Sequence, residues 1–335
     1  MRRSSALDVA HLISLSLFLA LSFSLYVRHN AASNRPAAKL ARARWRAGVT
    51  SRGAPVLPAS TLRRFLSGSS VILSRASVDS AIAAAVARTE ERETKISKAL
   101  GAGSGIGMAV CRVLAREGAK VVATDQNVKN VRETVNTLEG TGHVALHMQV
   151  AERASVETTF KDVKKQFSKP PTIIVNSAGI ITRGHIINFT DKDFDEIINV
   201  NLKGIFLVMQ AAVKAMIEAD TTKGSSIVNI SSIVAKQTFP MLGIYSATKA
   251  GVISITKTAS KEFGKLGIRV NTVLPGYIET PMVLSLSDEE KQGFLKQIAL
   301  RRSGQPQEVA ELIAFLVSDN SSYVNGADID ITGGK

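Results

Sequence analysis

The sequence has a single cysteine, Cys111, so it has no internal disulfide framework, and this scarcity fits a reducing compartment. Its five histidines are scattered: only His143 and His147 are close together, and no further ligand cluster accompanies them. We therefore expect no metal site. The chain has no internal repeat. With 45% hydrophobic and 21% charged residues, its 335 residues predict a globular protein that buries a large core.

Acidic residues are almost absent from the first part of the chain. Residues 1–78 contain twelve Lys and Arg residues against one acid, Asp8. This segment accounts for +11 of the net charge of +14, which leaves +3 for the rest of the chain. Because the excess charge lies outside the main body, a basic groove that binds nucleic acid is not expected.

Residues 1–95 differ in composition from residues 96–335, so we interpret them as a leader or extension before a single domain. The apolar run at 12–27 is short for a spanning helix, which needs about 20 residues. Three interpretations compete: a secretory signal, a membrane anchor, or part of an organelle leader. The stretch 31–77 favours the organelle leader, because it is rich in Arg, Ala and Ser and has no acids. The alternative is an extension without a role.

Apolar strands alternate with amphipathic helices from Gly101 onward. This alternation predicts an α/β fold with a doubly wound parallel sheet. The expected strands span 120–125, 143–150, 172–179, 225–232, 268–276 and 326–334, and the expected helices span 107–118, 128–138, 156–167, 194–219, 245–266 and 306–317.

Gly101, Gly105 and Gly107 form a G-x-x-x-G-x-G loop that opens the first of these helices. Glycines are needed in such a loop because the backbone lies against the phosphates of a dinucleotide at the helix N-terminus. Asp125 follows at the end of the next strand. A carboxylate there accepts hydrogen bonds from both ribose hydroxyls and repels a 2′-phosphate, which predicts NAD rather than NADP. The alternative role for Asp125 is a turn cap.

The segment that should form the strand before this loop is unusual. Its sequence, KISKAL at 95–100, has two lysines where a buried parallel strand needs apolar side chains. Either residues 96–100 lie in the sheet with Lys98 snorkelling at one end, or the segment comes from a mis-joined or alternative first exon and the native strand is absent. In both cases an apolar strand at 95–100 is expected to be more stable.

Tyr245 and Lys249 are four residues apart in IYSATKAG, so a helix places both on one face. A phenol has a pKa of about 10, and a nearby ammonium lowers that pKa toward the working range of an acid/base catalyst. Ser232 ends a strand 13 residues upstream, and ligands bind at the carboxyl ends of strands in this fold. Asn201 lies on the preceding helix, in NVNLKG.

Taken together, residues 101–334 resemble the short-chain dehydrogenase/reductase family, which has a Rossmann fold. The matching pieces are GAGSGIG, Asp125, NSAG (176–179), NVNLKG (199–204), NISS (229–232), YSATK (245–249), PGYIETPM (275–282) and the closing TGG. The resemblance implies a catalytic tetrad of Asn201, Ser232, Tyr245 and Lys249. Tyr245 would pass the proton and Ser232 would hydrogen-bond the substrate oxygen. Lys249 would bind the nicotinamide ribose and tune Tyr245, while Asn201 would hold a relay water.

The resemblance also implies NAD as the cofactor. Three positions depart from the family pattern: Leu100 replaces a Thr, Gln149 replaces an Asp and Ser177 replaces an Asn. Gln149 still offers an amide to adenine. The residues implied to bind NAD are Gly101, Ser104, Gly105, Ile106, Gly107, Asp125, Gln149, Val150, Asn176, Ala178, Gly179, Tyr245, Lys249, Pro275, Gly276, Ile278 and Thr280.

Within the family, NISSIVAK, GVISITKTA and RVNTVLPGYIETPM most resemble the group of 17β-hydroxysteroid dehydrogenase type 8 and 3-oxoacyl-[acyl-carrier-protein] reductase. This resemblance implies NAD-dependent oxidation of (3R)-3-hydroxyacyl-CoA or carrier-protein thioesters in mitochondrial fatty acid metabolism, with oxidation of estradiol beside it. It implies a location in the mitochondrial matrix and a homo- or heterotetramer, the latter with a carbonyl reductase type 4 subunit. One alternative is a weakly catalytic partner subunit of a hetero-oligomeric ketoacyl reductase, suggested by the unusual first strand. Another is a membrane-anchored enzyme held by residues 12–27.

Residues 281–302 combine apolar side chains with a charged turn. At this position in the fold, such a pattern favours a lid over an acyl chain or a steroid, and the alternative is an ordinary pair of surface helices. Arg301 and Arg302 are interpreted as a solvated pair and not as a phosphate site. The apolar positions of the expected lid are Met282, Val283, Leu284, Leu286, Phe294, Leu295 and Ile298.

Overall fold

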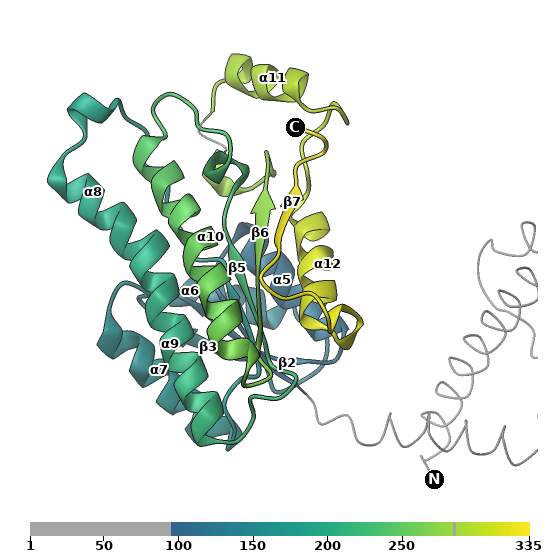
Figure 1. The fold of residues 1–335 in the computed structure, drawn as a ribbon. Helices are drawn as coiled ribbons and strands as arrows, with labels where there is room; N and C mark the ends of the chain where they lie inside the picture. The colour runs from purple at the N-terminus through teal and green to yellow at the C-terminus, as the bar shows by residue number, and fades with distance from the viewer. Residues whose placement is uncertain (1–94, 284–285) are drawn as a thin grey trace, which may run out of the picture. The chain divides into compact units, whose positions relative to one another are not determined.

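The computed structural model describes residues 95–283 and 286–335. Their strands form one all-parallel sheet in the order β3-β2-β1-β4-β5-β6-β7, which confirms the predicted fold class (Figure 1). Residues 1–94, which include the apolar segment 12–27, lie outside the described residues, so the leader stays a prediction. The strands are β1 (Ile96–Leu100), β2 (Lys120–Asp125), β3 (Val144–His147), β4 (Ile173–Asn176), β5 (Ser226–Ile230), β6 (Arg269–Pro275) and β7 (Asp328–Ile331).

Helices cover both faces of the sheet and enclose two apolar cores. Ile174 and Val175 are neighbours on β4 but belong to different cores, because successive strand side chains point to opposite faces. This explains why the central strands read as continuous apolar runs. One face carries α5 (Gly105–Arg116), α6 (Val128–Asn136) and α12 (Pro306–Val317), and the other carries α7 (Arg153–Phe167), α9 (Gly204–Glu218) and α10 (Gly243–Gly264).

The expected helix at 194–219 begins earlier and has an irregular turn. It starts as α8 (Asp191–Ile198), because the Thr190 side chain accepts a hydrogen bond from the Asp193 N–H and caps the first turn. A π turn at Asn199–Lys203 joins it to α9. The combined segment is long and apolar enough to cross a membrane, but half of its most apolar window is buried inside the fold, as in a core helix.

Several strands, β3 and β4 among them, end sooner than their sequence patterns predict. β3 was expected over 143–150 and β4 over 172–179, but both stop at the point where the chain leaves the sheet. The residues that follow, 148–150 and 177–179, line a cavity instead of continuing the ladder. Met148 and Val150 also pack in the core under this lining, so their apolar character reflects burial beyond the end of the strand.

Ile96–Leu100 forms the first strand, paired with β2 on one side and β4 on the other. Lys98 lies opposite Val122 and Ile174, and the strand prediction is confirmed. The snorkelling prediction is wrong: Lys98 is fully buried, and its Nζ lies 3.8 Å from the centroid of the Phe160 ring, with no hydrogen-bond partner among residues 95–283 and 286–335. The cause is its central position, since helices cover the strand and keep the stem from reaching water. Burial lowers the pKa of Lys98 to about 7.

Candidate active site

A cavity of about 560 Å³ lies at the carboxyl ends of the strands, where the loops after β1 and β4 diverge. In an open α/β sheet this divergence is the usual place for a ligand. The predicted site residues that line it are Gly101, Ser104, Gly105, Ile106, Asp125, Gln149, Val150, Ala178, Gly179, Ser232, Tyr245, Lys249, Pro275, Gly276, Ile278 and Thr280.

The glycine loop packs too closely for larger residues. Gly101 has a φ of +66°, and a Cβ there would lie 2.8 Å from the backbone of Ala178. Ser104, three residues after Gly101, is the N-cap of α5, and its side chain makes no capping hydrogen bond. The N–H groups of the first turn of α5 and this hydroxyl are therefore free to donate hydrogen bonds to phosphate oxygens on the cavity side of the loop.

Gly107 supports this loop from behind and does not line the cavity, and its role as a cofactor-binding residue stays a prediction. A Cβ at Gly107 would lie 2.2 Å from the Gly101 carbonyl oxygen. The absence of a side chain thus lets α5 pack directly against the loop. Its role is close packing of helix and loop, which sequence spacing alone does not distinguish from ligand contact.

Asp125 holds the glycine loop from the end of β2. Its Oδ2 accepts from the Gly103 N–H at 3.2 Å and its Oδ1 accepts from the Asn127 N–H at 3.0 Å. The carboxylate therefore organises a turn and also lines the cavity. Asp125 can therefore cap a turn and also accept hydrogen bonds from a ribose, because each carboxylate oxygen has a further lone pair.

Asn176 is buried within the sheet and does not line the main cavity, and its role in cofactor binding stays a prediction. Its Nδ2 donates to the Asn229 Oδ1 at 2.7 Å, which links the ends of β4 and β5. Asn229 in turn donates through Nδ2 to the Thr256 Oγ1 at 2.8 Å on α10. This polar chain ties the helix of Tyr245 to the sheet, and sequence analysis missed both Asn229 and Thr256.

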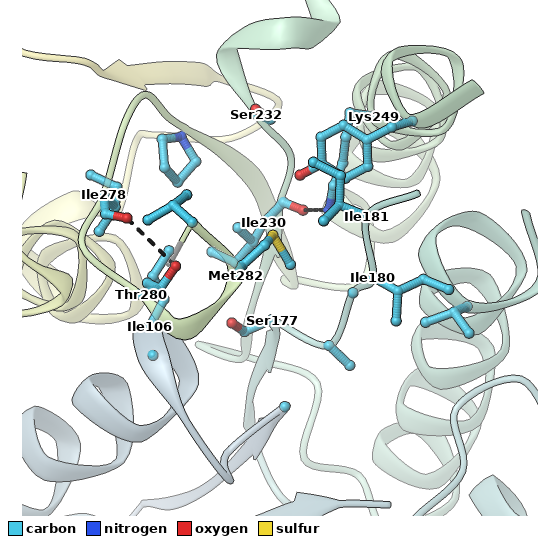
Figure 2. Close-up of a pocket in the computed structure, with 18 of the residues that line it drawn as sticks. Ile106, Ser177, Ile180, Ile181, Ile230, Ser232, Lys249, Ile278, Thr280 and Met282 are labelled. Carbon is cyan, nitrogen blue, oxygen red and sulfur yellow. Dashed lines mark hydrogen bonds between the residues drawn. The ribbon is translucent and has the colours of Figure 1, made fainter. Parts of the chain in front are cut away.

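Ser232, Tyr245 and Lys249 meet at one wall of the cavity. Ser232 follows β5 and caps the short 3₁₀ turn Ile233–Ala235, while Tyr245 and Lys249 project from α10. The Lys249 Nζ lies 5.6 Å from the centroid of the Tyr245 ring. Figure 2 shows the amine of Lys249 directed at the carbonyl of Ile230, to which it donates at 3.0 Å.

Burial dominates the ionisation of this pair. It raises the pKa of Tyr245 to about 12, against a smaller lowering by a hydrogen bond with Ser232. It lowers the pKa of Lys249 to about 8. The expectation that the ammonium brings the phenol pKa below its ordinary value is therefore wrong for the protein alone. The reason is that desolvation of a buried phenolate outweighs a charge located 5.6 Å from the ring centroid.

Asn201 lies behind this wall, fully buried in the π turn, and does not line the cavity. Its Oδ1 accepts from the Ile180 N–H at 2.8 Å and its Nδ2 donates to the Ile180 carbonyl, also at 2.8 Å. Nδ2 makes a further, longer contact of 3.4 Å to the Thr248 Oγ1. The side chain thus fixes the loop after β4 next to α10, and its role in holding a relay water stays a prediction.

Beyond the tyrosine, the cavity becomes apolar. Met282, Val283, Leu286 and Phe294 of the expected lid line it, whereas Ile298 is buried in the fold and Leu295 does not line it. Leu284 lies outside the described residues. Sequence analysis missed several other lining residues, whose signal was an apolar side chain just after a strand or short turn. They are Ile180, Ile181, Ile233, Val234, Phe239, Leu242 and Tyr277, and Figure 2 shows Ile180 and Ile181 across from Met282.

The wall formed by α11 (Asp288–Gln297) is held by aromatic contacts and one ion pair. The Phe294 ring stacks on Tyr277 with centroids 5.5 Å apart and meets Phe239 edge-on at 6.1 Å. Arg183, in the loop after β4, pairs with Glu290 of this helix at 2.8 Å. In Figure 1, α11 lies beyond the carboxyl ends of the strands, near the last residues of the chain.

These features fit a dinucleotide at one end and an apolar substrate at the other. The glycine loop has no space for a side chain at Gly101, and Asp125 and Lys249 both line the cavity. Among the described residues, no group of three His, Cys, Asp or Glu side chains is arranged to hold a metal ion. The arrangement thus suits proton transfer by Tyr245 beside a bound cofactor.

Comparisons with known proteins agree with this geometry. Residues 101–335 match the family described as enoyl-(acyl carrier protein) reductase. The chain is 41% identical over 243 residues to human (3R)-3-hydroxyacyl-CoA dehydrogenase, covering 70% of this chain and 92% of that protein. It is also 41% identical over 244 residues to the 3-oxoacyl-[acyl-carrier-protein] reductase FabG of Thermotoga maritima, covering 72% and 98%.

A solved structure shares the fold over the same region. It is a short-chain dehydrogenase/reductase of the glucose/ribitol dehydrogenase type from Brucella melitensis, 31% identical, with a TM-score of 0.68 and coverage of 72% of this chain and 96% of that one. The chain therefore belongs to the short-chain dehydrogenase/reductase family, whose members are oxidoreductases of CH–OH groups that use a nicotinamide cofactor, and within it resembles the 3-oxoacyl-[acyl-carrier-protein] reductase group.

Proposed function

We propose that this protein is an NAD-dependent oxidoreductase that interconverts (3R)-3-hydroxyacyl and 3-oxoacyl thioesters. The observation that carries the proposal is the convergence of Ser232, Tyr245 and Lys249 on a cavity with a glycine loop at one end and apolar walls at the other. The names of the relatives support a thioester substrate, since both refer to acyl groups carried by CoA or acyl carrier protein.

In this proposal the substrate oxygen lies between Ser232 and Tyr245. A nicotinamide bound there would supply the redox chemistry, accepting a hydride from the alcohol carbon or returning it to the ketone carbon, while the remaining proton belongs to the substrate oxygen. Ser232 donates a hydrogen bond to the substrate oxygen and orients it. Tyr245 exchanges the proton of that oxygen, and with its pKa near 12 it is protonated and ready to donate in the ketone-reducing direction.

Oxidation of the alcohol needs the phenolate of Tyr245, and Lys249 is the group that favours it. The Lys249 amine donates one hydrogen bond to the Ile230 carbonyl. A protonated lysine has three donors, so a second one is available to a ribose hydroxyl. A bound ribose also displaces water from the wall, which strengthens the attraction between the ammonium and the phenolate. Lys249 therefore serves both cofactor binding and proton transfer.

The preference for NAD rests on Asp125. Its carboxylate lines the cavity at the end of β2 and is already the acceptor for two backbone N–H groups of the loop. A 2′-phosphate next to it would bring two negative charges together, whereas a ribose hydroxyl would donate to it. We therefore assign NAD(H), and not NADP(H), as the cofactor.

The alternative is that this chain is a weakly catalytic partner subunit, which the unusual first strand suggested. β1 is paired along its length with β2 and β4, which supports an intact cradle and favours the enzyme. We also propose a mitochondrial location, supported by the basic, acid-poor segment 1–78, and a tetrameric assembly, either of this chain alone or with a carbonyl reductase type 4 subunit.

The test is a coupled spectrophotometric assay of the purified full chain with NAD and NADP. The substrates are (3R)-3-hydroxybutyryl-CoA, its (3S) enantiomer and estradiol. We expect turnover of the (3R) thioester with NAD, and estradiol turnover would add the steroid activity. Absence of thioester turnover with either cofactor, in a folded protein that binds NAD, would favour the partner subunit. Size-exclusion chromatography with light scattering gives the assembly of the same sample.

A further inference from the structure

Lys335 is a cation on the wall of the substrate end of the cavity. Its Nζ lies 4.2 Å from the centroid of the Phe239 ring and 4.8 Å from that of Phe294 on α11. The residue is neither buried nor fully exposed, so its ammonium stands at the boundary between the cavity and solvent. No sequence pattern pointed to this residue.

The other cations around the cavity are already engaged. Arg183 forms an ion pair with Glu290 at 2.8 Å, and Lys249 donates to the Ile230 carbonyl inside the cavity. Arg302, considered for phosphate binding from the sequence, pairs with Glu308 at 2.6 Å and does not line the cavity. Lys335 differs, because within residues 95–283 and 286–335 no carboxylate forms an ion pair with it.

Its aromatic neighbours attract the ammonium without neutralising it. Two ring faces hold a cation by their quadrupoles, and the same rings pack against the apolar stem of the lysine. The positive charge therefore remains available to an anion that enters beside Phe294. Partial burial lowers the pKa of Lys335, and an approaching anion opposes that lowering.

We propose that Lys335 is a specificity-determining residue that binds the phosphate of the phosphopantetheine arm on the acyl thioester. This inference rests on the proposed function, since that arm is what acyl-CoA and acyl carrier protein thioesters have in common. The apolar walls around Met282 and Phe294 accept the uncharged part of the substrate, while Lys335 accepts its charged part at the solvent boundary. A phosphate there gains a charge-assisted hydrogen bond that an uncharged thioester lacks.

The test compares two substrates that differ only in the phosphate: 3-hydroxybutyryl-4′-phosphopantetheine and 3-hydroxybutyryl-pantetheine. Lys335→Met keeps an apolar stem against both rings and removes the charge. We expect it to lower kcat/KM for the phosphorylated thioester about tenfold, through KM, and to leave the pantetheine thioester within twofold of the wild type. Lys335→Arg keeps the charge and is expected to retain the preference for the phosphorylated substrate.

Lys296→Met is the matched control, because Lys296 is exposed on α11 and does not line the cavity. Equal effects of Lys335→Met on both thioesters, or no effect on either, would overturn the inference and leave Lys335 as a packing residue. If the folded wild-type enzyme turns over neither thioester, the proposed function itself fails, which is a different result from turnover of both without discrimination. Thermal unfolding of each variant shows whether a loss of activity comes from a loss of folding. If Lys335→Met does not fold, the comparison of the two thioesters with Lys335→Arg decides whether the charge at this position is required.

Discussion

The Lys98 ammonium nitrogen and the Phe160 ring are 3.8 Å apart, and they join the central strand β1 to α7 inside the core. Lys98 is fully buried, its strand neighbours Val122 and Ile174 are apolar, and no hydrogen-bond partner for its Nζ occurs among the described residues. Within that part of the chain, the compensation for a cation here is the face of the Phe160 ring. The free energy of unfolding should therefore depend on pH through Lys98, in the strand beside the glycine loop.

We predict that Lys98→Met stabilises the protein by roughly 2 to 4 kcal/mol at pH 7, since it replaces a buried amine by an apolar side chain of similar length. The native pKa of about 7 lies below the ordinary value of 10.5, so between these values the unfolded chain holds one proton more than the native protein. Wild-type stability therefore rises with pH over that window, and the cost of Lys98 is greatest below pH 7.

The measurement is chemical unfolding of wild type and variant at pH 7, 8 and 9. The advantage of Lys98→Met should shrink as pH rises, by at most ~1.4 kcal/mol for each pH unit. Lys120→Met, at the exposed start of β2, is the control and should show no such trend. An advantage that is constant across this range would mean that Lys98 stays protonated in the native core, as it does in the unfolded chain.

Tyr245→Phe is expected to reduce kcat by about 10²- to 10⁴-fold while NAD binding stays nearly intact, because only the phenol hydroxyl, the proton donor, is removed. Lys249→Ala should damage both turnover and NAD binding, since its amine is assigned to the ribose as well as to the phenol. Steady-state kinetics and titration of cofactor binding by calorimetry separate the two effects. A Tyr245→Phe variant that turns over near the wild-type rate would contradict the assignment of the proton donor.

Replacing Asp125 by Ala should reduce the ratio of kcat/KM for NAD to that for NADP. The variant removes the carboxylate that would face a 2′-phosphate, but it also removes the acceptor for the Gly103 and Asn127 N–H groups. Asp125→Asn is therefore the companion variant, because it keeps one acceptor oxygen and loses the charge. A wild-type enzyme that already prefers NADP would refute the assignment, whatever the variants do.

A fluorescent reporter fused to residues 1–78 is expected to accumulate in mitochondria, because this segment has twelve basic residues and one acid. Fluorescence microscopy with a matrix marker checks the location. A matched segment in which the arginines are replaced by glutamine should remain in the cytosol. Glycosylation of the reporter, or its appearance at the plasma membrane, would point instead to a signal or an anchor at residues 12–27.

Much of the fold and part of the site followed from local patterns in the sequence. β2 and α12 have the bounds that their apolar periodicity predicted, at 120–125 and 306–317. The spacing of Tyr245 and Lys249 placed both side chains on one helix face, and the structure brings both to the cavity. The helix features are predictable because helix periodicity depends on neighbouring residues alone.

Other properties depend on segments that are far apart in the sequence and were decided only by packing. Gly101 has no space for a side chain because the backbone of Ala178 lies against it, and Asn176 supports the site from behind because it donates to Asn229. Tyr245 has a raised pKa because the surrounding elements remove water from it, which outweighs its lysine neighbour four residues on.

The sequence by itself determined the order of strands and helices, the glycine loop and the tyrosine–lysine pair, since each is encoded by residues within one or two turns of one another. The tertiary structure decided that Lys98 is buried against Phe160 and that Lys335 reaches the cavity beside Phe294. The physical reason is that burial, and with it the free energy of a charge, is set by which distant side chains displace water from it, and no local spacing specifies those contacts.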